Sequence, residues 1–106
     1  MSANLFQSIN SDKTQADGVF SVSLGVADGC RYHQIQLELS AVPAAGSLAV
    51  AVRSPGAEDY VTIDTLDMTA GGQIKTYGPA FVSDIRFTPT SFDAGKTYNV
   101  IVLAGK

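Results

Sequence analysis

The sequence is poor in charge and in the side chains that most often carry chemistry. Only 16% of its 106 residues are charged, and it has one cysteine, one histidine and no tryptophan. An average soluble domain has roughly 25% charged residues. A single cysteine cannot form an intrachain disulfide, and one cysteine with one histidine cannot build a zinc site. No apolar run reaches the length of about 18 residues that would span a membrane. These absences exclude a disulfide scaffold, a zinc domain and a membrane helix.

Basic residues are also scarce. Seven Lys and Arg stand against ten Asp and Glu, which gives a formal net charge of -3 and a pI near 4.7. The basic residues are scattered singly, whereas nucleic-acid-binding domains usually carry a basic stripe. The N-terminal residues lack the basic segment and the apolar stretch of a secretory signal. We expect no nucleic-acid partner, no membrane partner and no secretory signal.

The sequence is rich in turn residues and in β-branched residues. Ten Gly and four Pro interrupt the chain at short intervals. Short runs of alternating or continuous apolar residues, typical of strands, recur between them. They cover residues 20–26, 33–40, 48–52, 60–64, 73–77, 81–88 and 97–103. Seven short strands, or eight if residues 5–9 also pair, predict one all-β domain, either a sandwich or a small barrel. We expect an antiparallel, jelly-roll-like β-sandwich.

Two local features lead to more specific predictions. Asp28-Gly29 lies between the first two runs and favours a hairpin turn, so residues 20–40 are expected to form a β-hairpin. Pro89 is expected to end the strand that begins at Phe81, because proline cannot donate a hydrogen bond to a β-ladder. Within that strand the alternation puts Phe81 on the same face as Phe87.

The first 17 residues are set apart from the rest. The apolar residues Leu5, Phe6 and Ile9 precede a polar stretch, residues 10–18, without periodicity. They form either an edge strand or an arm that packs on a neighbour, which makes them candidate assembly contacts. The predicted division is an arm or edge strand plus polar loop over residues 1–17 and a β-sandwich domain over residues 18–106.

No arrangement of residues predicts catalysis or a cofactor. His33 falls on an apolar strand face, and no serine lies in a Gly-x-Ser-x-Gly elbow, so a minimal hydrolase is only a third alternative. Cys30 is expected to be structural, although Arg31 beside it could lower the pKa of its thiol. A calcium site is a weaker alternative to solvated turn carboxylates, because the acidic residues do not follow a calcium-loop spacing. These residues are Asp12, Asp17, Glu58, Asp59, Asp64 and Asp67.

The low charge of the exterior has two explanations. The chain is either simply a small, Thr-rich β domain, or much of its surface meets other subunits, since interface cores are depleted in charge. Tyrosines on polar strand faces suit an interface or the stacking surface of a carbohydrate site. The candidates are Tyr32, Tyr60 and Tyr77.

Residues 50–103 carry a recognisable pattern of turns and strands. Its parts are Ser54-Pro55-Gly56 to Val61, the run from Gly78-Pro79 through Ile85-Arg86-Phe87-Thr88-Pro89 to Thr90, and a final Ala94-Gly95-Lys96-Thr97-Tyr98-Asn99-Val100. This pattern resembles small β-sandwich virion structural proteins of tailed bacteriophages. It holds only turn and core positions, so it identifies no functional residue.

The resemblance implies a non-enzymatic protein that assembles on a phage particle as a capsid decoration, a head-fibre base or a small tail component. Its partners would be other capsid or tail subunits and further copies of itself, for example in a trimer. It would be made in the cytoplasm of the host bacterium and reside in the virion. The alternative from a different class is a carbohydrate-binding β-sandwich module, with Tyr60 and Tyr77 contacting a glycan.

Overall fold

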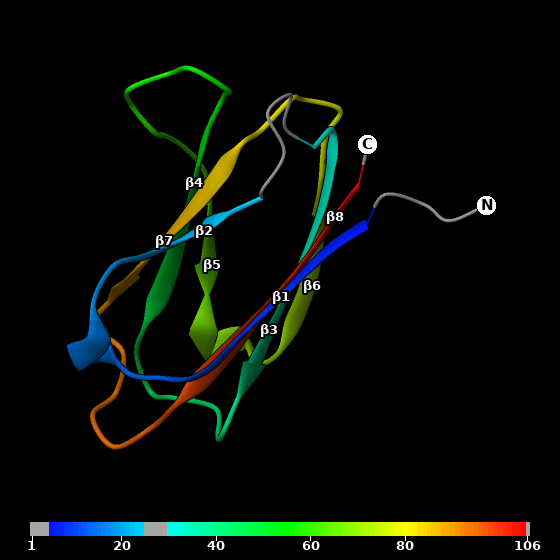
Figure 1. Ribbon diagram of the computed structural model, residues 1–106. Helices are drawn as coiled ribbons and strands as arrows, with labels where there is room; N and C mark the ends of the chain where they lie inside the picture. The colour runs from blue at the N-terminus through cyan, green and yellow to red at the C-terminus, as the bar shows by residue number, and fades with distance from the viewer. Residues whose placement is uncertain (1–4, 25–29, 106) are drawn as a thin grey trace.

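The computed structural model describes residues 5–24 and 30–105 (Figure 1). These residues form eight strands and two short 3-10 helices, η1 (Gln15–Asp17) and η2 (Met68–Ala70). The strands are β1 (Leu5–Lys13), β2 (Phe20–Ser23), β3 (Tyr32–Leu39), β4 (Ser47–Arg53), β5 (Val61–Asp67), β6 (Gln73–Tyr77), β7 (Asp84–Thr90) and β8 (Tyr98–Gly105). The predicted all-β antiparallel sandwich is confirmed.

The strands form two four-stranded sheets packed face to face. The first sheet has the order β1-β8-β3-β6 and the second has the order β2-β7-β4-β5, with every neighbouring pair antiparallel. Strands β1 and β2 are consecutive in the chain and are edge strands of different sheets, as are β5 and β6. Each sheet therefore has an inner face toward the core and an outer face toward solvent.

The inner faces are made by alternate apolar residues. In β8, Val100 and Val102 are fully buried, and in β7 Ile85 and Phe87 are fully buried opposite them. The Phe87 ring stacks on Phe20 with a centroid distance of 5.1 Å. Because each inward residue is followed by an outward one, the same pattern that builds the core also decides which side chains the outer faces present.

The predicted hairpin over residues 20–40 is wrong. Strand β2 pairs with β7 in the second sheet, whereas β3 pairs with β6 and β8 in the first sheet. Asp28-Gly29 itself lies outside the described residues. Alternation fixes which face of a strand is buried, but it does not fix which strand is its neighbour, and here the chain crosses from one sheet to the other between the two runs.

Two predictions about β7 are also wrong. The strand begins at Asp84, and Phe81 is 56% exposed while its neighbour Val82 is buried and bridges Cys30. Pro89 lies inside the strand, paired with Leu48 of β4. Its carbonyl accepts a hydrogen bond from Gln15 Nε2. Strand β2 pairs with β7 only from Asp84 to Phe87, so no residue of β2 lies opposite Pro89 to need its missing N–H.

The N-terminal segment forms a long edge strand. Residues of β1 pair with β8 from Leu5 opposite Gly105 to Lys13 opposite Tyr98, so the strand runs through much of the stretch expected to be a polar loop. Phe6 packs against the core and Ile9 points outward, 62% exposed. After β1, Thr14 caps η1, and its hydrogen bonds lower the pKa of the Asp17 carboxyl.

The strand predicted over residues 60–64 begins one residue later and continues to Asp67. Two apolar residues near the start of this strand, Val61 and Ile63, are exposed. The register of β4 and β5 shifts after Val50, which pairs with Asp64, while Ala51 pairs with Thr62. An extra residue in an edge strand twists the edge and interrupts its free hydrogen-bonding groups.

His33 is the one buried polar residue of the described core, at 4% exposure. Its Nε2 donates a hydrogen bond of 2.8 Å to the Cys30 carbonyl. Burial lowers the pKa of His33 below its ordinary value of 6.5, against the opposing effect of backbone hydrogen bonds. The ring is therefore neutral at pH 7, with Nε2 held by the Cys30 carbonyl.

A pH dependence of stability follows from this histidine. Because the unfolded chain binds the His33 proton more tightly than the folded chain, stability should be retained above pH 6.5 and fall as the pH drops below it. Urea unfolding between pH 7.5 and about 5 measures the slope. The variant His33→Gln keeps an N–H donor and does not titrate, so its slope should be flatter. An identical slope in both proteins would contradict the assignment.

Candidate functional site

The outer face of the first sheet collects uncharged polar and apolar side chains. On β3, Ile35 and Leu37 face the core, so Gln34, Gln36 and Glu38 face outward, together with Tyr32 at the start of the strand. The outward positions of β8 and β6 beside them hold aliphatic side chains, a threonine and Asn99. Alternation along each strand therefore decides which side chains reach this face, and strand pairing places them side by side.

Two rows of side chains cross all four strands of this face. The first row is Gln7, Leu103, Gln34 and Thr76, and the second row is Ile9, Ile101, Gln36 and Ile74. Neither row contains a charged residue. At one end lies Glu38, which accepts a hydrogen bond of 3.3 Å from Asn99 Nδ2. A glycan or a protein would meet amides, hydroxyls and aliphatic carbon on this face.

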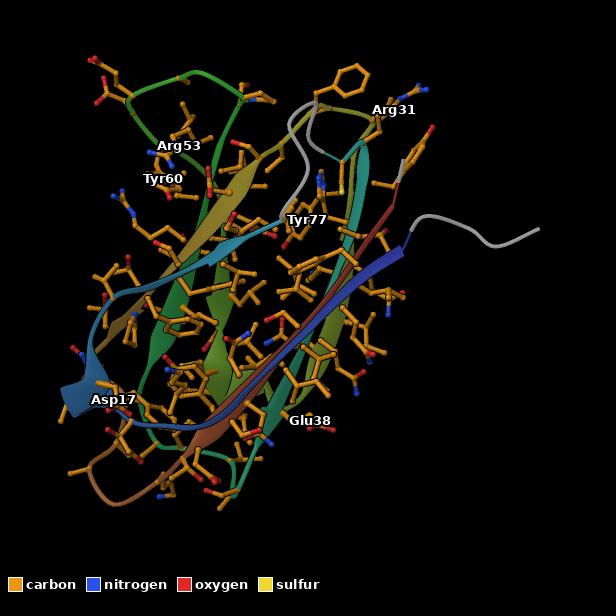
Figure 2. All side chains as sticks on the ribbon, viewed as in Figure 1. Asp17, Arg31, Glu38, Arg53, Tyr60 and Tyr77 are labelled. Carbon is orange, nitrogen blue, oxygen red and sulfur yellow. The ribbon has the colours of Figure 1, made fainter. Side chains whose placement is uncertain are left out.

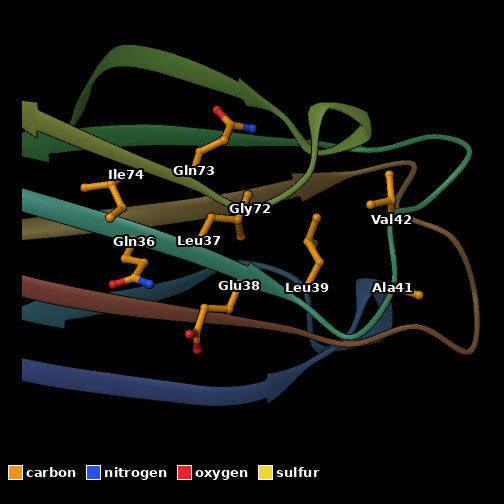
Figure 3. A pocket seen from close by; sticks show the side chains of 9 residues that line it. All are labelled: Gln36, Leu37, Glu38, Leu39, Ala41, Val42, Gly72, Gln73 and Ile74. Atoms are coloured by element: carbon orange, nitrogen blue, oxygen red, sulfur yellow. The ribbon is translucent and has the colours of Figure 1, made fainter.

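The surface is hollowed at both ends of the β3–β6 pair. A depression of about 380 Å³ lies between Tyr32, Gln34, Thr76 and Leu103. A second one, of about 660 Å³, lies beyond Gln36 and Ile74 and reaches Val42 (Figure 3). Because Gln34 and Gln36 are successive outward residues of β3, as are Thr76 and Ile74 of β6, the two depressions follow one line. We call this line the β3–β6 groove.

Tyr32 is the exposed aromatic side chain of the groove, and the guanidinium carbon of Arg31 lies 5.5 Å from its ring centroid. It is 51% exposed, and its strand partner on β8 is Gly105, which has no side chain to cover the ring. From Tyr32 to Glu38 the strand extends over six residues, or about 20 Å. The groove is thus long and shallow, with an aromatic ring at one end and a carboxylate at the other.

Tyr77 has a structural role. Its hydroxyl donates a hydrogen bond of 2.8 Å to Asp64 Oδ2, which ties edge strand β6 of the first sheet to edge strand β5 of the second. Burial and this hydrogen bond raise the pKa of the Tyr77 hydroxyl. Its ring only borders the groove. The pairing of Tyr60 with Tyr77 in one glycan site, expected from the sequence, does not occur on this face.

Tyr60 belongs to the opposite side of the sandwich. Its ring lies 4.7 Å from the guanidinium carbon of Arg53 and 4.4 Å from that of Arg86, both on the second sheet. The three tyrosines named from the sequence therefore differ in position. Tyr32 is exposed in the groove, Tyr77 is hydrogen-bonded across the two sheets, and Tyr60 packs against two arginines. The structure does not bring them together.

The remaining candidates take structural positions. Cys30 is buried, and its backbone bridges Val82. Within residues 5–24 and 30–105, the His, Cys, Asp and Glu side chains form no group of three or more that could hold a metal ion. No helix in the described part of the chain is long and apolar enough to cross a membrane. Leu5, Phe6 and Ile9 all belong to edge strand β1, and Ile9 is in the second row of the outer face.

The glutamines were missed from the sequence. Gln34 and Gln36 alternate with buried residues, as any surface residues of a strand do, and only the absence of charge at these positions sets them apart. The third partner, Thr76, comes from a short strand forty residues away in sequence, and pairing of β3 with β6 brings it beside Gln34. A single sequence does not specify such a pairing.

Comparisons with known proteins identify the fold. No protein family matches the sequence, and no curated protein matches it. Among solved structures the chain is similar to a mutant of a family 29 carbohydrate-binding module, with a TM-score of 0.54 and 13% identity over 93% of this chain and 69% of that one. It is also similar to the family 32 carbohydrate-binding module of NanJ from Clostridium perfringens in complex with galactose, with a TM-score of 0.54 and 14% identity over 93% of each chain.

A third similarity is to a protein derived from the SPBc2 prophage, YomS. The TM-score is 0.56 with 10% identity, and the match covers 97% of both chains. The chain also aligns with a family 89 glycoside hydrolase from Clostridium perfringens, of which it spans only 14%. At these identities the similarities establish a shared β-sandwich fold.

Proposed function

We propose that the chain is a non-catalytic carbohydrate-binding module whose ligand is a neutral oligosaccharide. The observation that carries the proposal is the β3–β6 groove, whose two depressions are lined by uncharged side chains apart from Glu38, with an exposed tyrosine at the opposite end. Its length favours a chain of several sugar units over a single ring. The structural similarity to carbohydrate-binding modules supports the same reading.

Each part of the groove matches one feature of a neutral sugar. The open Tyr32 ring offers an apolar surface for the C–H face of a pyranose. Gln34 and Gln36 each offer two donors and one acceptor, which suits hydroxyl groups that both donate and accept. Leu103 and Ile74 provide aliphatic contacts beside them, and Glu38 can accept a hydrogen bond from a hydroxyl at the far end.

The proposal is tested with a panel of neutral tetrasaccharides built from glucose, mannose or galactose. Isothermal titration calorimetry should show saturable binding of at least one of them. Longer oligomers should bind more tightly than the corresponding monosaccharide, because more of the groove is filled. No binding of any member, or equal binding of monomer and tetramer, would contradict a ligand that lies along β3 and β6.

A second function, assembly on a phage particle, is favoured by one specific observation. The prophage-derived protein and this chain match over nearly their whole lengths. Large apolar side chains are exposed on edge strands, including Ile9 on β1 and Val61 on β5, where a neighbouring subunit could cover them. Under this reading the partners are capsid or tail subunits or further copies of the chain, and the location is the virion.

Solution mass separates the two functions. Sedimentation velocity at high micromolar concentration should give an oligomer, for example a trimer, if the chain assembles with itself. A monomer that binds no capsid or tail shell would rule out the assembly function, and a monomer that binds a tetrasaccharide would support the carbohydrate-binding one.

A further inference from the structure

The outer face of the second sheet differs in character from the β3–β6 groove. On β7, Ile85 and Phe87 face the core, so Asp84 and Arg86 face outward. Arg86 lies opposite Ser21 of β2 and opposite Ala51 of β4. This face therefore has an arginine at its centre, with the exposed Ser21 hydroxyl on one flank and the buried Ala51, 4% exposed, on the other.

One tyrosine ring supports two arginines on this face. The ring centroid of Tyr60, just before β5, lies 4.4 Å from the Arg86 guanidinium carbon and 4.7 Å from that of Arg53. Figure 2 labels Tyr60 and Arg53 beside each other. A guanidinium that packs on an aromatic ring loses freedom of movement while its N–H groups remain able to donate. Tyr60 thus holds Arg86 in place ahead of any ligand.

The two arginines differ in how their charge is compensated. Arg53 donates from Nε and Nη2 to Asp84 Oδ2, at 3.2 and 2.8 Å. Asp84 also accepts a hydrogen bond of 2.9 Å from Ser83. Although burial raises the pKa of Asp84, these hydrogen bonds lower it overall, so the carboxylate is charged and balances Arg53. The ion pairs of the described residues are Arg53 with Asp84 and Lys96 with Asp93, so Arg86 has no acidic partner among them.

We propose that Arg86 binds a carboxylate group on the face opposite the β3–β6 groove. A planar carboxylate matches the fork of a guanidinium and can accept two parallel N–H bonds from it. Ser21, directly across the β2–β7 pair and exposed, can donate a third hydrogen bond. The ligand class is a small organic acid or the carboxylate of a uronic acid.

Arg31 provides an internal comparison. It also lies over two aromatic rings, those of Tyr32 and Phe81, at 5.5 and 5.7 Å. It is exposed and precedes β3, rather than being flanked by strands on both sides as Arg86 is. Removing Arg31 takes away the same charge without touching the proposed site. It therefore distinguishes a site at Arg86 from general attraction of anions.

The test is an NMR titration of the ¹⁵N-labelled chain with sodium glucuronate at constant ionic strength. We expect saturable shifts of the Arg86 Nε–H signal and the Ser21 amide signal. Glucose, the uncharged counterpart, should leave both unchanged. Sodium propionate carries a carboxylate but no sugar ring. Shifts equal to those of glucuronate would assign the recognition to the carboxylate alone, and weaker shifts would show that the sugar ring also contributes. If glucuronate causes no saturable shift of the Arg86 Nε–H signal, the proposal is overturned.

Variants make the test specific. Arg86→Gln should weaken glucuronate binding about tenfold or more, and Arg86→Lys, which keeps the charge but loses the fork, should weaken it several-fold. Tyr60→Ala should weaken binding by freeing Arg86, whereas Tyr60→Phe should not. Arg31→Gln should bind as the unchanged chain does. An equal loss in Arg31→Gln and Arg86→Gln would overturn the site, and thermal unfolding of each variant identifies any that fails to fold.

Discussion

Replacing Tyr32 with alanine should weaken binding of the best neutral tetrasaccharide about 30-fold, or about 2 kcal/mol, because exposed aromatic anchors supply a large share of the energy of such contacts. The ring is 51% exposed and lies opposite Gly105, so no side chain of β8 directly opposite covers it. Calorimetry of the variant against the same tetrasaccharide measures the loss.

Two control variants make this result specific. Tyr32→Phe keeps the ring and should retain most of the affinity. Val61→Ala removes another exposed apolar side chain, on β5 of the second sheet, and should leave the affinity unchanged. If Tyr32→Ala binds as tightly as the unchanged chain, or if Val61→Ala loses as much, the ligand does not stack where we propose.

Replacing Phe87 with alanine should reduce the free energy of unfolding by about 3–5 kcal/mol, a large fraction of the stability of a small domain. Phe87 is fully buried and stacks on Phe20 at the centre of the sandwich, and the smaller side chain would leave a cavity there. The change is measured as a lower urea midpoint in equilibrium unfolding.

Phe81→Ala is the matched control for this prediction. Because Phe81 is 56% exposed, its loss should change the free energy of unfolding by no more than about 0.5 kcal/mol. From sequence alternation the two phenylalanines were expected on the same face. Similar destabilisation of both variants would favour that alternation over the structure, in which the strand begins only at Asp84.

The comparison shows what the sequence could and could not predict about the fold. Alternation placed His33 correctly on the face shared with Ile35 and Leu37, because burial of every second residue is a local property of a strand. The pairing of β2 with β7 is not local. It depends on which strands pack together after the chain has crossed between the sheets, and the Asp28-Gly29 dipeptide pointed to the wrong neighbour.

The candidate site was predicted only in part. Tyr32 was singled out for its ring and lies in the groove. Tyr77 was singled out for the same reason, and its hydroxyl instead holds Asp64 across the two sheets. The face on which Gln34 meets Thr76 exists only through the pairing of β3 with β6. Residue type indicated what a site would need, whereas strand pairing decided where those residues meet.

The most direct test of the central claim is amide chemical-shift mapping of the ¹⁵N-labelled chain with the tetrasaccharide that binds most tightly. The predicted result is a set of shifts along β3 and β6, strongest at Tyr32, Gln34 and Thr76, with the second sheet unchanged. Shifts confined to the second sheet or to the loops, with none along β3 and β6, would contradict a carbohydrate site on the outer face of the first sheet.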